Sequence, residues 1–271
     1  MRPSTDDRCT VLAALLVLAL VPRGAAALTG REVIDDAQKK NGFSTWKDRT
    51  LSAHMDTYSG DSLTRTREVE ISEQTDPHGE HRTFMKFNAP ADVQGTLFLH
   101  LSPRGAKDQQ WLWTPQARRV RRLAEAQEDE NFFGTDLSYR DLELLVRIQQ
   151  WTDAESTAVL EPEPSTVDGK SCHVVTLTPK NEEFPYTKYR LLFETDALLL
   201  RQVDVWDQNG TLVKRVLPRK YQRIGGYATA IESDVANVSA ATHTLFTLRD
   251  VTYDTGVPDN TFSLSNISKG Q

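Results

Sequence analysis

Apolar and polar residues alternate with a period of two over most of the chain, which is typical of β-strands with one buried face. In 49–58, for example, Leu51, Ala53 and Met55 fall on one side of the predicted strand and polar residues on the other. Pro and Gly turns separate such segments, which indicates an antiparallel meander. Further strands are predicted over 64–73, 82–87, 96–102, 110–114, 171–179, 189–195, 200–206, 211–217, 227–236 and 243–253.

Two segments have helical spacing instead. In 28–41, Thr29 is a typical N-cap and Glu32, three residues later, completes a capping box. A second helix is predicted over 138–151, with Ser138 as its cap. The residues that share one face of this second helix are Leu142, Leu145, Val146 and Gln149.

Three connecting segments differ in character. The acidic stretch 123–132 is expected to be a mobile loop or a short frayed helix, and the proline-containing 161–164 a stiff exposed connection. Asn209-Gly210 predicts a hairpin with a type I′ turn, because both residues tolerate a positive φ. No short repeat and no domain-sized linker interrupts the chain, so residues 28–271 are expected to form a single domain.

One long antiparallel sheet with two helices must bury one of its faces. A strongly curved sheet can do so by wrapping its concave face around the helices as an incomplete barrel. Two helices do not fill so wide a trough, which leaves room for an apolar cavity. The predicted fold class is therefore mainly β with few helices, a large curved antiparallel sheet with helices covering its concave face.

Four linked motifs support this architecture. A Phe-x-x-Pro-x-Asp-x-x-Gly-Thr-x-Phe-Leu run begins at Phe87, and a Gln-Trp-Leu-aromatic-x-Pro strand begins at Gln110. An Arg-Val-Arg-Arg arm occupies 119–122, and a Phe-x-Gly-x-Asp-x-x-Tyr-x-Asp-Leu turn begins at Phe132. In this order the motifs resemble the outer-membrane lipoprotein-sorting protein family, the LolA/LolB-like periplasmic proteins. The resemblance implies a bacterial half-barrel whose helices form a lid over a lipid-binding hollow.

The first 27 residues are predicted to be a signal peptide. Arg2 and Arg8 precede an apolar run over 11–21, and three alanines at 25–27 suit a signal peptidase. The run is shorter than the roughly 20 residues that span a bilayer, and an uncleaved anchor is the alternative. We expect the mature chain to begin near Leu28, in the periplasm.

The two cysteines set further limits. Cys9 lies before the apolar run, so it is not the lipid acceptor of a lipoprotein, and a membrane-anchored receptor of the LolB type is excluded. Cys172 is then the single cysteine of the mature chain, which excludes an internal disulfide. Because it lies in an alternating strand, it is expected to behave as a small buried residue.

The chain is acidic. It carries 32 basic and 38 acidic residues, a net charge of −6, and loss of the three basic and two acidic residues in 1–27 changes this to −7. An acidic domain argues against nucleic-acid binding, which depends on a basic surface. No second long apolar segment follows, so we expect the mature chain to be soluble. We also expect a monomer.

The chain lacks a recognisable catalytic or metal-binding pattern. It has neither a Gly-x-Ser-x-Gly elbow nor a Gly-rich phosphate loop. His78 and His81 have no third ligand nearby, which makes them a weak metal signal. The spacing of Asp136 and Asp141 suits helix capping better than an acid–base pair. We therefore expect a protein that is not an enzyme and needs no cofactor or metal.

Large apolar residues are candidates for lining the predicted cavity, the alternative being that they are ordinary core. Alternation places Trp111 and Trp113 on one face of their strand and Leu112 on the other, and we expect the two tryptophans to face inward. The candidate lining residues are Leu97, Leu99, Trp111, Trp113, Leu142, Leu145, Leu191, Phe193, Val203 and Val205.

A basic arm contrasts with the acidic whole. Arginine binds phosphate bidentately, so Arg118, Arg119, Arg121 and Arg122 are candidates for docking to acidic lipid head groups or to an acidic partner. The alternative is a solvated strand whose charges prevent edge-to-edge pairing. Nucleic acid fits poorly, because no aromatic residues interleave with the arginines.

Together these features predict a periplasmic carrier of the lipoprotein-sorting type, which holds a lipid or the acyl chains of a lipid-modified protein in an apolar cavity. The alternative is a sensor or adaptor with the same fold that docks a membrane transporter or a signalling partner. An inner-membrane transporter is thus a further candidate partner. A third hypothesis, an enzyme acting on lipid, lacks a catalytic set.

Overall fold

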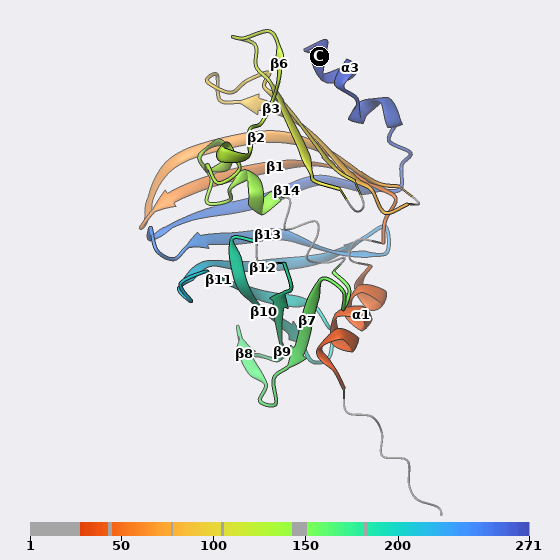
Figure 1. Cartoon of the computed structure of the whole chain (residues 1–271), viewed down its shortest axis with the longest axis vertical. Coiled ribbons are helices and arrows are strands. Elements are labelled where there is room, and N and C mark those ends of the chain that lie inside the picture. The colour runs from red at the N-terminus through yellow and green to blue at the C-terminus, as the bar shows by residue number, and fades with distance from the viewer. Residues whose placement is uncertain are drawn as a thin grey trace, which may run out of the picture.

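The computed structural model describes residues 28–42, 45–76, 78–103, 106–142, 151–181 and 184–270. Within these residues, 14 strands form one antiparallel sheet (Figure 1). The strands are β1 (Asp48–Ser59), β2 (Ser62–Thr75), β3 (His81–Ala89), β4 (Leu97–Ser102), β5 (Gln109–Trp113), β6 (Val120–Arg122), β7 (Ser156–Leu160), β8 (Ser165–Val167), β9 (Lys170–Pro179), β10 (Tyr186–Glu194), β11 (Leu200–Asp207), β12 (Leu212–Ile224), β13 (Tyr227–Asn237) and β14 (Thr242–Tyr253).

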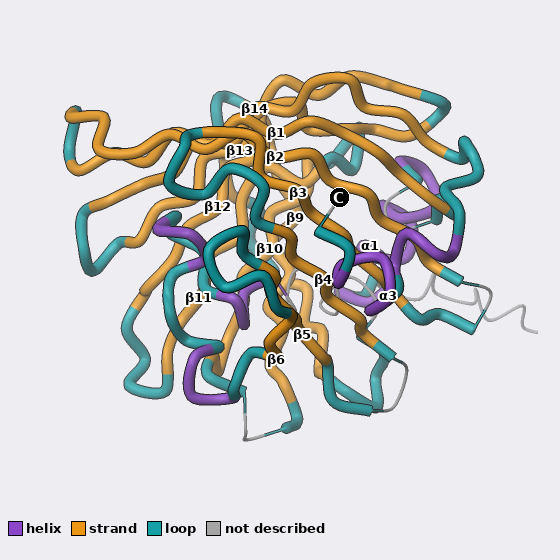
Figure 2. Tube along the Cα trace, turned by 90° about the horizontal axis from the view of Figure 1, so that it is seen from above, coloured by secondary structure: helices purple, strands orange, loops and turns teal. Residues whose placement is uncertain are grey.

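The two halves of the chain build the two halves of the sheet. From β1 the strands follow in sequence order to β6 at one edge, and from β14 they follow in reverse order to β7 at the other. The halves join where β1 pairs with β14, and β8 pairs with β9 beside this path. The sheet curves into a barrel (Figure 2). This barrel is incomplete, because among the described strands β6 and β7 at its two edges do not pair with each other. The predicted fold class, mainly β with a curved antiparallel sheet, is confirmed.

Helix α1 (Gly30–Asn41) begins and ends as predicted. The backbone N–H of Glu32 donates to the Thr29 hydroxyl at 3.2 Å, and the Thr29 N–H donates to the Glu32 carboxylate at 2.8 Å. Gly42, with φ of 72°, ends the helix in the left-handed conformation that glycine adopts readily. The buried face of α1 packs on side chains of β9, β10 and β11, among them Leu177, Leu191 and Val205.

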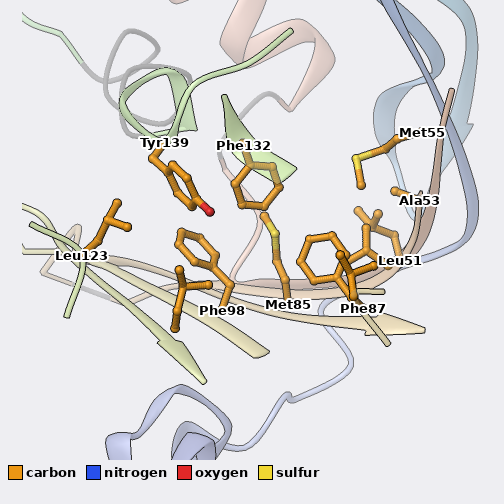
Figure 3. Close-up of a cluster of buried hydrophobic side chains, with 12 residues drawn as sticks. Leu51, Ala53, Met55, Met85, Phe87, Phe98, Leu123, Phe132 and Tyr139 are labelled. Carbon is orange, nitrogen blue, oxygen red and sulfur yellow. The ribbon is translucent and has the colours of Figure 1, made fainter. Parts of the chain in front are cut away.

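The segment after β6 folds onto the inner face of the sheet. It contains two short 3-10 helices, η1 (Glu125–Gln127) and η2 (Phe132–Gly134), where a loop or frayed helix was expected. The predicted second helix begins at Tyr139, and beyond Leu142 it lies outside the described residues up to Trp151. Phe132 and Tyr139 point toward Phe98 on the sheet (Figure 3), with ring centroids 5.4 and 5.9 Å from it.

The C-terminal segment lies on the outer face of the sheet, and the sequence did not predict its helices. It consists of η3 (Asp259–Phe262) and α3 (Leu264–Ser268), and α3 lies beside β4 (Figure 2). Phe262 and Ile267 are buried against side chains of β4 and β5. This helix on the outer face is an addition to the predicted architecture, which named only helices covering the concave face. No helix within the described residues has the length and apolar character needed to cross a membrane.

The hairpin between β11 and β12 forms at the predicted position, but the predicted turn type is wrong. Gly210 has a positive φ of 75°, whereas Asn209 does not. The Asp207 carboxylate accepts hydrogen bonds from the backbone N–H of Asn209 and of Thr211, at 2.9 and 2.8 Å. This side chain holds the turn in a form that needs the left-handed conformation at Gly210 only.

Candidate ligand-binding hollow

A hollow of about 470 Å³ lies between the inner face of the sheet, α1 and the segment 132–142. Both halves of the sheet line it: Met55 comes from β1 and Met85 from β3, whereas Leu191 comes from β10 and Val205 from β11. Most of the lining side chains are apolar. The volume is in the range of pockets that bury most of the surface of a drug-sized ligand.

An ion pair lies within this apolar lining near the end of α1. The Arg49 Nε donates to the Glu73 carboxylate at 2.6 Å, and the Arg49 guanidinium lies 5.1 Å from the centre of the Trp46 ring. The His81 Nε2 is 3.8 Å from the other Glu73 oxygen. Burial alone would raise the pKa of Glu73, but the charge and hydrogen bond of Arg49, with the His81 imidazole nearby, outweigh it and lower the pKa to about 2. The pair is thus ionised and internally neutralised.

A second polar cluster lines the hollow near the start of the second helix. The Asp141 carboxylate accepts hydrogen bonds from the backbone N–H of Ser138 at 2.6 Å, from the Tyr186 hydroxyl at 2.7 Å and from the Lys214 ammonium. Lys214 also donates to the backbone oxygen of Asp136 at 3.1 Å. Asp141 therefore caps its helix, as predicted, and also ties that helix to β10 and β12.

Tyr189 on β10 faces the same hollow beside this cluster. Its side chain is 3% exposed, and its hydroxyl is one of the few buried polar atoms without a hydrogen-bond partner among the described residues. Burial and the nearby Asp141 carboxylate both raise the pKa of Tyr189, so the hydroxyl stays protonated. It is therefore a hydrogen-bond donor without a partner in the wall of the hollow.

The structure brings together half of the predicted lining residues. Leu142, Leu191, Phe193, Val203 and Val205 line the hollow, and Leu145 lies outside the described residues. The other four residues pack on the outer face of the sheet against the C-terminal segment, so the prediction that they face inward is wrong. On β4, it is Phe98 and His100 that face inward. These four are Leu97, Leu99, Trp111 and Trp113.

The basic arm lies at the edge of the sheet, where β6 pairs only with β5 among the described strands. Arg118 and Arg119 are exposed in the turn before it, and Arg121 and Arg122 are exposed on β6 itself. Arg121 donates to the Gln127 side chain at 3.0 Å. Docking by the arm stays a prediction, and the edge position also suits protection against edge pairing.

The sequence analysis missed the polar groups of the hollow. Arg49 lies two residues before Leu51 and therefore faces inward with Ala53 and Met55. Tyr189 likewise lies on the same face of its strand as Leu191 and Phe193. Extending each alternating pattern to the ends of its strand would have placed these side chains inside. Pairing between strands, which brings Arg49 directly opposite Glu73, had no signal in the sequence.

Other candidates are accounted for by local contacts. Cys172 is a free, buried cysteine, as predicted, and burial raises the pKa of its thiol. Asp136 does not cap a helix: its carboxylate accepts from the Thr242 and Thr244 hydroxyls of β14. His81 is buried beside Glu73, and the described residues contain no group of three His, Cys, Asp or Glu side chains that could hold a metal ion.

Comparison with known proteins identifies a matching family model and solved structures with a similar fold. A family model with the description "Uncharacterized protein" matches residues 79–269. A DUF1329 family protein from Desulfovibrio piger has a TM-score of 0.77 at 26% identity, covering 87% of this chain and 97% of its own. A putative outer membrane lipoprotein-sorting protein domain from Vibrio parahaemolyticus has a TM-score of 0.76 at 21% identity, covering 88% and 97%. A LolA superfamily protein from Nitrosomonas europaea has 0.66 at 13%, covering 88% and 99%.

At such identities the last two structures show a shared fold, and the LolA-like resemblance stated from the motifs is confirmed. No curated protein matches this chain in sequence.

Proposed function

The chain belongs to the family whose model matches residues 79–269 and has a LolA-like fold, and from this premise we propose that it is a periplasmic carrier of lipid. The cargo is a lipid or the acyl chains of a lipid-modified protein, held in the hollow. The role is binding, not catalysis, and it needs no cofactor. The predicted signal peptide over 1–27, which lies outside the described residues, would deliver the chain to the periplasm.

The hollow itself carries this proposal. Burying an acyl chain stabilises a complex by roughly 0.8 kcal/mol for each CH₂ group. Val69, Ile71, Phe246 and Leu248 are among the side chains that offer such a surface on the inner face of the sheet. A cargo in this position would be shielded from water while it crosses an aqueous compartment, and its release would require the segment 132–142 to move.

A pair of matched substitutions tests the proposal. Ser233 on β13 lines the hollow, so Ser233→Trp would occupy part of it, whereas Ser52 on β1 precedes the inward-facing Ala53 and faces away from the hollow. We expect the wild-type protein and Ser52→Trp to bind N-phenylnaphthylamine, an uncharged fluorescent probe, and Ser233→Trp to bind it far more weakly. Equal binding by both variants, or no binding by the wild-type protein, would remove the basis for a carrier.

The exposed arm supports a second candidate function, an adaptor that docks a membrane transporter or signalling partner. Four arginines within 118–122 give a basic surface at the rim of an otherwise acidic molecule. Native mass spectrometry of protein purified from its own periplasm separates the two functions. A bound lipid supports the carrier, and a stable protein complex of the lipid-free chain supports the adaptor.

A further inference from the structure

The unpartnered hydroxyl of Tyr189 is held in a fixed position. The Tyr189 ring makes edge contacts with Trp151 and Tyr186, at centroid distances of 5.5 and 6.1 Å. These two aromatic neighbours hold the ring, and with it the hydroxyl oxygen, in place. A buried polar group without a hydrogen bond destabilises a protein, and each such group in a native structure calls for an explanation. The explanation that fits this site is a ligand atom.

The acidic and basic side chains around the hollow already lie beside partners of opposite sign, with His81 next to Glu73 and His100 next to Asp108. Within the described lining, Arg49 pairs with Glu73, and Lys214 pairs with Asp141. Burying a further charge without a partner is costly, and the Asp141 carboxylate would repel an anionic head group placed beside Tyr189. An uncharged head group avoids both penalties.

We infer that the cargo of the hollow is an uncharged amphiphile, a long-chain alcohol or ester, whose oxygen accepts a hydrogen bond from the Tyr189 hydroxyl. This inference rests on the proposed carrier function and specifies its ligand. The alkyl chain lies along the apolar lining, and the head group lies beside the Asp141–Lys214 cluster. A hydroxyl or ester oxygen supplies the acceptor that the protein itself leaves open.

Displacement of N-phenylnaphthylamine from the full mature chain provides the test. The competitors are hexadecanol, methyl palmitate and sodium palmitate, which have alkyl chains of similar length and differ in head group. At about pH 8, where the fatty carboxylate is ionised, we expect hexadecanol and methyl palmitate to bind at least several-fold more tightly than palmitate. Tyr189→Phe is expected to weaken the two uncharged competitors by about tenfold and to leave palmitate unchanged.

Tyr221→Phe is the matched control. Tyr221 also lines the hollow, but its hydroxyl donates to the backbone oxygen of Leu200 at 2.6 Å. This variant should lose melting temperature and keep its affinity for hexadecanol. Tyr189→Phe should lose affinity without losing melting temperature, because its hydroxyl makes no bond in the empty protein.

The outcomes separate this inference from the proposed function. If the probe binds but palmitate competes as well as hexadecanol, or if Tyr189→Phe binds hexadecanol as the wild type does, the inference is overturned and the carrier function stands. A lower melting temperature in Tyr189→Phe would also contradict it, because the hydroxyl would then have a partner in the empty protein. If the wild-type protein binds neither the probe nor any competitor, the carrier function fails as well.

Discussion

Glu73 shows how a single residue makes a charged group compatible with an apolar hollow. Its carboxylate bonds to Arg49, and its pKa is lowered to about 2 against the burial that would raise it. Because the pKa is lower in the folded than in the unfolded protein, the stabilisation is present above the unfolded value of about 4.3 and is lost as the pH falls toward 2. We therefore expect the Arg49–Glu73 pair to stabilise the folded protein at neutral pH and to lose this contribution in acid.

We predict that Glu73→Gln removes most of this acid sensitivity. Between neutral pH and about pH 2, the free energy of unfolding of the wild-type protein should fall further than that of the variant, by an amount on the order of 3 kcal/mol. Denaturant titrations at several pH values measure this. Glu70→Gln, an exposed neighbour on β2, is the control and should behave like the wild type. A pH profile of Glu73→Gln parallel to that of the wild type would contradict the pairing.

At the level of elements, the outer face of β4 and β5 depends on a short C-terminal helix. Ile267 of α3 is fully buried with Leu97, Leu99 and Trp111, whereas Leu264 of the same helix is 45% exposed. Apolar residues on both faces of β4 are thereby buried. The inner face packs against the segment 132–142, and the outer face packs against α3. The helix stabilises the sheet from outside and does not reach the ligand.

We predict that Ile267→Ala lowers the free energy of unfolding by about 2 to 4 kcal/mol, since it empties a fully buried position. Leu264→Ala should change it by no more than about 0.5 kcal/mol. Both variants should bind the fluorescent probe as the wild type does. A loss of probe affinity in folded Ile267→Ala would mean that the outer face contributes to the ligand site after all.

The edge strand β6 gives a second prediction at this scale. Arg119 and Arg122 are exposed, so replacing both with Glu should leave folding intact and weaken binding to vesicles of anionic lipid several-fold. The binding of the wild type should itself decline as salt screens the charges. Vesicle flotation measures both effects. The double variant Arg219→Glu/Arg249→Glu makes the same change of charge at exposed positions on β12 and β14, and equal loss in both variants would point to net charge and not to the arm.

For the whole molecule, the hollow exists only because two halves of the chain meet. β1 and β14 pair over most of their length, and the lining comes from strands on both sides of this junction. A ligand that touches both halves should therefore stabilise the whole sheet. It binds the folded state alone, because the unfolded chain has no hollow.

We predict that an uncharged amphiphile at about 100 times its dissociation constant stabilises the protein by about 2.7 kcal/mol. Thermal unfolding with and without hexadecanol measures this as a rise in melting temperature. Ser233→Trp should show no rise, and Ser52→Trp should show the full rise. A rise in Ser233→Trp equal to that of the wild type would place the ligand outside the hollow.

Local order was readable from the sequence because it depends on near neighbours in the chain. The capping boxes at Thr29 and Ser138 lie within three residues of their partners, and strand alternation is a property of consecutive residues. These signals, with the motifs that resemble the LolA-like proteins, were enough to predict an unclosed antiparallel sheet with an inner cavity. The turn at Asn209 was misjudged because the Asp207 side chain, and not φ preference alone, selects the turn type.

Tertiary structure decided which face of each strand became the inside. Alternation divides residues such as Trp111 and Leu112 between two faces, but it does not tell which face is concave, and β4 is apolar on both. That choice was made by α3 covering Leu97, Leu99 and Trp111 from outside, at a separation of roughly 160 residues along the chain. The pairing of Arg49 with Glu73 likewise depends on the register of β1 with β2, and the isolation of the Tyr189 hydroxyl depends on the packing around it. The sequence alone thus determined the elements and the kind of sheet, whereas long-range packing determined the chemistry of the hollow.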